Sequence, residues 1–62
     1  MTYKLWFADK LECLTATERQ EAACEAQRRC AELGKSGDMM DEQGRIVASI
    51  SPASIQFMAW AN

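Results

Sequence analysis

A capped helical segment over residues 15–33 is the longest regular piece of this chain of 62 residues. Thr15 stands at the expected N-cap and Glu18 three residues later, which is a capping box, so the helix is predicted to begin at Ala16. Gly34 follows the last helical position and can adopt the positive φ that ends many helices. The pattern therefore predicts one helix over residues 16–33, around which the rest of the fold is arranged.

The two sides of this helix differ in chemistry. At about 100° per residue, one arc of about 120° is apolar apart from Arg19. This arc holds Ala16, Ala22, Ala23, Ala26, Cys30 and Leu33. The small side chains let the helix axis approach a sheet closely. The glutamates of the segment lie together within about 60° of arc. They are Glu18, Glu21, Glu25 and Glu32.

The segment before the helix predicts a first hairpin. Residues 2–7 alternate with the period of a half-buried strand, placing Tyr3, Leu5 and Phe7 opposite Lys4 and Trp6. A three-residue turn, Ala8-Asp9-Lys10, then leads into a return strand over residues 11–14. In that strand one face holds Leu11 and Cys13, and the other holds Glu12 and Leu14.

A second hairpin is predicted after the helix. The run Asp41-Glu42-Gln43-Gly44 has aspartate first and glycine fourth, as a type I turn with a glycine bulge requires. This register pairs Asp41 with Arg45 as an exposed ion pair, with an expected contribution below about 1 kcal/mol. It also predicts a core face made of Met40, Ile46, Ala48 and Ile50.

The last segment has two interpretations. Ser51-Pro52 is typical of the start of a short helix that would run to Trp60, whereas Ile55, Phe57 and Ala59 alternate as an edge strand does. We favour the helix. The whole chain, residues 1–62, is thus predicted to form one compact α+β domain. It comprises a small antiparallel sheet of two β-hairpins, about four strands, one long amphipathic helix packed on one face, and a short C-terminal helix or edge strand.

Composition limits the class of function. Hydrophobic residues make up 48% of the chain, which is typical of a folded globular domain. No apolar run approaches the roughly 20 residues that span a membrane, and the N-terminus lacks a signal-peptide pattern. The three cysteines form no Cys-x-x-Cys pair. We therefore expect a cytoplasmic protein with reduced thiols, without membrane, metal or cofactor.

Catalysis and direct nucleic-acid binding are both disfavoured. The chain has no histidine, so its serines and threonines lack the usual general base, and glutamates on an outward helix face are ordinary solvated groups. Seven basic residues against nine acidic ones give a net charge of −2, whereas phosphate binding requires a clustered basic face. We expect a protein that is not an enzyme.

The acidic stripe is the best sequence clue to a partner. A solvated helix face oriented to suit the helix dipole explains it most simply. The sharper hypothesis is a small acidic inhibitor of phage or mobile-element origin, of the anti-CRISPR or antirestriction type, which occupies the basic nucleic-acid-binding groove of a larger host complex. The predicted partner-binding residues are Glu18, Glu21, Glu25, Glu32, Asp38, Asp41, Glu42 and Trp60.

Tight binding also requires aromatic anchors, and Trp6 and Trp60 are the candidates, although each can instead belong to the core. The alternative function is a self-associating structural or accessory protein. In that case Phe57, Met58 and Trp60 would pack across the two-fold axis of a homodimer.

Overall fold

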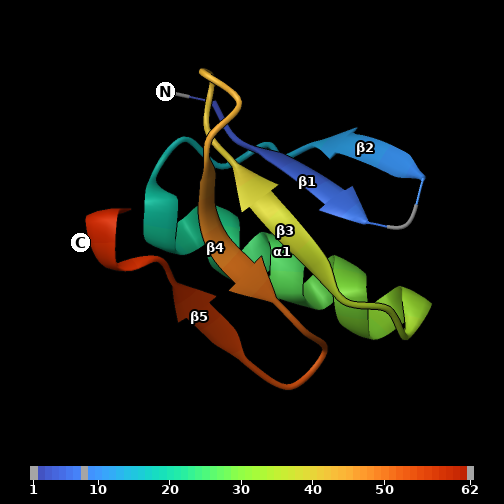
Figure 1. The fold of residues 1–62 in the computed structure, drawn as a ribbon. Helices are drawn as coiled ribbons and strands as arrows, with labels where there is room; N and C mark the ends of the chain where they lie inside the picture. The colour runs from blue at the N-terminus through green and yellow to red at the C-terminus, as the bar shows by residue number, and fades with distance from the viewer. Residues whose placement is uncertain (1, 8, 62) are drawn as a thin grey trace.

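The computed structural model describes residues 2–7 and 9–61 and has an α+β fold (Figure 1). The elements in chain order are β1 (Lys4–Phe7), β2 (Lys10–Cys13), α1 (Arg19–Leu33), β3 (Gly37–Met40), β4 (Ile46–Ile50), β5 (Ile55–Phe57) and the 3₁₀ turn η1 (Ala59–Ala61). The predicted class is confirmed, but the sheet has five strands, one more than the two predicted hairpins supply.

All five strands form one sheet in the order β2-β1-β3-β4-β5, and every neighbouring pair is antiparallel. Strands β2 and β3 therefore run in the same direction on either side of β1, and α1 connects them. This crossover carries α1 across one face of the sheet, where it contacts β3, β4 and β5. Figure 1 looks onto the sheet with α1 behind it, and none of the described elements lies in front of the strands.

The core lies between α1 and this covered face of the sheet. Leu5, Met39 and Ala48 are paired across β1, β3 and β4 and are fully buried. Opposite them, the buried residues of α1 are Ala22, Ala23, Ala26 and Cys30, as predicted from the apolar arc. Leu33, which the arc also included, is exposed.

The helix begins later than predicted. α1 starts at Arg19, and its N-cap is Glu18 in an extended conformation without a side-chain cap hydrogen bond. The capping box at Thr15 is therefore wrong, because Glu25 from further along the helix takes the hydrogen bonds of this segment. The predicted C-terminus is confirmed, since Gly34 has φ 65° and its N–H donates to the carbonyl of Cys30.

The first hairpin forms with a shorter connection. Lys10 already belongs to β2 and pairs with Phe7, so the prediction of Lys10 as a turn residue is wrong. Ala8, the first residue of that predicted turn, lies outside the described residues.

In the second hairpin the turn is confirmed, and so are Ala48 and Ile50 of the predicted core face, but Met40 and Ile46 of that face are wrong. The N–H of Gly44 donates to the carbonyl of Asp41 at 3.0 Å, and Gly44 has φ 80°. Met40 pairs with Ile46 as predicted, yet Met39 pairs with Ala48, so Val47 is an extra residue in a β-bulge. This bulge turns Met39 into the core in place of Met40 and leaves Ile46 exposed.

The C-terminal segment forms the edge strand β5, so the favoured helix through Trp60 is wrong apart from the single turn η1. The Oγ of Ser51 accepts a hydrogen bond from the N–H of Ser54 at 3.0 Å. The backbone N–H of Ser51 also donates to the carbonyl of Ser54 at 2.9 Å. This tight turn makes β5 the next antiparallel strand after β4.

Candidate partner-binding surface

The predicted binding residues do not form one continuous acidic surface. Glu25, Glu32 and Asp41 have partners within the chain. Glu18, Glu21 and Glu42 are exposed and make no polar side-chain contact within residues 2–7 and 9–61. Asp38 lies in β3 opposite Trp6, and Trp60 lies in the 3₁₀ turn η1.

Glu25 anchors the connection between β2 and α1. Its carboxylate accepts hydrogen bonds from the backbone N–H groups of Thr15 and Ala16, each at 3.0 Å to Oε1, and from the hydroxyl of Thr15. Partial burial opposes ionisation, but these bonds hold the pKa of Glu25 below its ordinary value. Glu25 therefore has a structural role and is not free to meet a partner.

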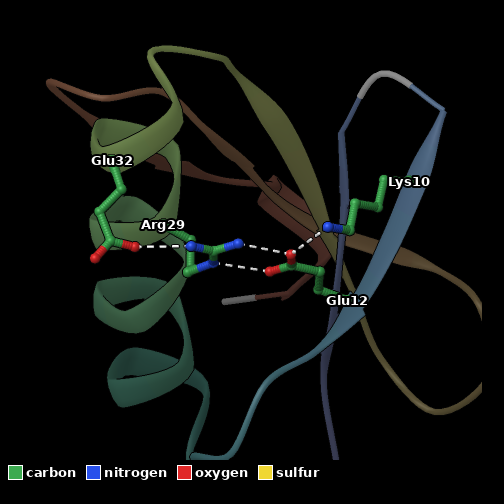
Figure 2. Close-up of polar contacts among 4 residues, drawn as sticks. All are labelled: Lys10, Glu12, Arg29 and Glu32. Carbon is green, nitrogen blue, oxygen red and sulfur yellow. Dashed lines mark hydrogen bonds and ion pairs between the residues drawn. The ribbon is translucent and has the colours of Figure 1, made fainter.

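Glu32 belongs to a charge network that ties α1 to β2 (Figure 2). Arg29 donates two parallel hydrogen bonds to Glu12, from Nε to Oε1 at 2.9 Å and from Nη2 to Oε2 at 2.7 Å. Its Nη1 also donates to Glu32 at 2.9 Å, and Lys10 lies 3.3 Å from Glu12 on the other side. The negative charge of Glu32 is thus compensated within the chain.

The Glu12–Arg29 pair is a strong internal contact that the sequence did not reveal. The hydrogen bond from Arg29 lowers the pKa of Glu12 from 4.5 to about 2, with Lys10 assisting, and raises that of Arg29. Glu12 pairs with Leu5 in the sheet and so faces α1, which brings it to Arg29 17 residues away. The spacing of residues in the sequence does not predict the Glu12–Arg29 contact, because the contact depends on where α1 packs against the sheet.

Asp41 and Trp60 meet through Arg45. Asp41 is only 6% exposed and accepts hydrogen bonds from the N–H groups of Gln43 at 2.9 Å and Arg45 at 3.0 Å. The Arg45 backbone bond is the main cause of a lowered pKa at Asp41. Arg45 also forms an ion pair with Asp41 at 3.0 Å, so the predicted pair exists, but its acid is buried instead of exposed.

The same Arg45 guanidinium lies 4.6 Å from the centre of the Trp60 ring. Trp60 is nonetheless 52% exposed. A buried acid thus orients an arginine, and the arginine supports an exposed tryptophan. We call Asp41, Arg45 and Trp60 the Trp60 platform.

The start of α1 is joined to the C-terminal segment. Arg19 lies over the ring of Phe57 at 5.2 Å, and Phe57 packs against the core from β5. α1 and β5 accordingly contact one another on the covered face of the sheet. Glu18 directly precedes Arg19, so an unpaired carboxylate lies at the same end of the molecule as β5.

Asp38 lies on the uncovered face of the sheet, away from the glutamates of α1. It pairs with Trp6, which is 43% exposed and therefore not a core residue. Leu11 and Ile46, also exposed, were missing from the predicted site. The sequence did contain a signal for this uncovered face, because the alternation of residues 2–7 places Trp6 and Leu5 on different faces of the strand.

The thiols differ in environment. Cys13 and Cys24 are exposed free cysteines, whereas Cys30 is buried, and burial raises the pKa of its thiol.

Over the described ranges no group of three or more histidine, cysteine, aspartate or glutamate residues is placed to hold a metal ion, and no pocket is present. No helix in this part of the chain is long and apolar enough to cross a membrane. Comparison with protein-family models, curated proteins and solved structures gave no match to the chain.

Proposed function

We propose that this chain is a non-enzymatic protein-binding module that inhibits a larger host complex by covering its basic nucleic-acid-binding surface. This is the mode of action of anti-CRISPR and antirestriction proteins from phages and mobile elements. The Trp60 platform is the observation that carries the proposal. It offers an exposed aromatic side chain that lies against Arg45, which is itself paired with the buried Asp41.

A supported tryptophan suits the centre of a protein interface. Binding energy is concentrated in a few aromatic and arginine side chains, and a side chain already held in place loses less entropy when a partner binds. Both residue types are present in the Trp60 platform at a separation of 4.6 Å between guanidinium and ring. The proposed contact therefore has Trp60 as its anchor.

Negative charge around the anchor would come from Glu42, in the turn after Asp41, and from Glu18 and Glu21 at the start of α1. These carboxylates are exposed and uncompensated within the described chain. They can attract a basic groove over about 10 Å at ordinary ionic strength. The proposed acidic part of the site is thus smaller than the full predicted stripe, since Glu25 and Glu32 hold the fold.

The test is capture of a host complex on immobilised protein, followed by competition with nucleic acid. We expect capture to weaken with salt and with Trp60→Ala, and excess nucleic acid to release the captured complex. Leu33→Ala is the matched control, because it also truncates an exposed apolar side chain, at the opposite end of α1.

Charge reversal tests the acidic component separately. The double variant Glu18→Lys, Glu21→Lys should lower capture about tenfold or more, mainly by slowing association. Asp9→Lys reverses the charge of an exposed carboxylate just before β2 and should leave capture unchanged. Capture that resists salt, nucleic acid and charge reversal alike would contradict the inhibitor proposal.

A further inference from the structure

The sheet has an uncovered face, which the strand register defines residue by residue. Leu5, Met39 and Ala48 form a row directed at α1, so the rows on either side of it point away from the helix. One of these rows comprises Leu11, Trp6, Asp38, Ser49 and Gln56. The other comprises Cys13, Lys4, Met40 and Ile46. We call these nine residues the open face, which is directed at the viewer in Figure 1.

Exposed apolar area is concentrated here. Trp6, Leu11 and Ile46 are 43%, 45% and 41% exposed, and they are three of the five large apolar side chains that the described part of the chain exposes. Trp6 and Leu11 are directly paired across β1 and β2. Ile46 lies two strands away from Trp6, in the neighbouring row beside Met40. Exposed apolar side chains gathered on one face and bordered by polar residues are characteristic of a surface that another molecule covers.

The charges of the open face favour a second copy of the chain as the occupant. Lys4 and Asp38 are its only charged members, and neither forms an ion pair within the described residues. A basic partner would require excess negative charge, and a nucleic acid would require excess positive charge. A surface with one charge of each sign is instead complementary to itself, because a two-fold rotation can place Lys4 of one copy opposite Asp38 of the other.

We propose that the open face packs against the open face of a second copy of this chain across a two-fold axis. The pairing uses a surface separate from the Trp60 platform and holds whether or not the inhibitor function is correct. Five strands about 4.8 Å apart and about four residues long give a footprint near 19 by 13 Å. This is smaller than the roughly 800 Å² per partner of a standard interface, so the dimer is weak and reversible.

Two free cysteines give an internal test in the native protein. Cys13 belongs to the open face, whereas Cys24 is exposed on α1, on the opposite side of the sheet. Under reducing conditions, brief maleimide labelling is measured from about 1 µM to about 1 mM protein, the range in which weak complexes assemble. We expect Cys13 labelling to slow severalfold as light scattering reports a doubling of mass, while Cys24 labelling stays constant. A monomer throughout, or a dimer that leaves Cys13 reactive or protects Cys24 equally, overturns the proposal.

Charge exchange tests the two-fold pairing itself. Lys4→Glu makes the open face doubly negative and Asp38→Lys makes it doubly positive, so each variant alone should dimerise about tenfold more weakly. An equimolar mixture should form a heterodimer, and the double variant should recover self-association. Lys35→Glu, outside the open face, should dimerise as the parent does. Circular dichroism checks that each variant is folded, and a mixture no more associated than its components overturns the pairing.

Discussion

At Gly37, β3 lies too close to β1 to leave room for a side chain. A Cβ atom added there would lie 2.6 Å from the carbonyl oxygen of Trp6 and 2.9 Å from the Cβ of Phe7. Both neighbours belong to a strand held on each side, so they cannot move away freely. We expect Gly37→Ala to lower the free energy of unfolding by about 1–3 kcal/mol, measured by urea denaturation.

Ser36→Ala is the matched control for this glycine. Ser36 is exposed and adjacent to Gly37, and its replacement should change the free energy of unfolding by less than about 0.5 kcal/mol. If Gly37→Ala changed the free energy of unfolding as little as Ser36→Ala does, the close approach of β3 to β1 would not be the reason for a glycine at position 37.

At the scale of single elements, the N-terminal connection of α1 depends on one side chain. Glu25 accepts hydrogen bonds from the N–H groups of Thr15 and Ala16. In a capping box Glu18 would have accepted the first of these. We expect Glu25→Gln to raise the hydrogen-exchange rates of these two amides about tenfold, because the charge-assisted bonds are lost. Glu21→Gln removes a neighbouring charge that has no internal contact and should leave both rates unchanged. Equal rates in the two variants would contradict this role of Glu25.

The elements that the sequence predicted well are those encoded by neighbouring residues. Gly34 ends α1 and Gly44 closes the turn between β3 and β4, because each supplies a positive φ that its own position demands. The helix start depends on Glu25, ten residues from Thr15. The bulge at Val47 and the strand at residues 55–57 depend on how neighbouring strands pair and pack against the core, which local residue types do not specify. The same distinction applies to the site, since the exposed Trp60 could be proposed from the sequence but its support by Arg45 could not.

For the molecule as a whole, three of the nine acidic residues connect elements of the fold. Glu12, Glu25 and Asp41 each accept several hydrogen bonds, and the pKa of each is lowered in the folded state. Glu12 joins β2 to α1, Glu25 holds the connection between β2 and α1, and Asp41 holds the turn between β3 and β4. Ionisation of these groups is therefore linked to the stability of the entire domain.

Acid stability tests this linkage at Glu12. Its pKa is 4.5 ordinarily and about 2 in the folded protein, so between these pH values the unfolded chain binds a proton that the folded chain does not. The stabilisation by Glu12 is complete above the unfolded pKa and disappears as pH falls toward about 2. We expect Glu12→Gln to melt below the parent at pH 7, and the difference in thermal midpoint to vanish near the folded pKa. Glu21→Gln, which removes a solvated carboxylate, should follow the parent profile. A Glu12→Gln deficit that stays constant down to that pH would assign the loss to packing and not to the ion pair with Arg29.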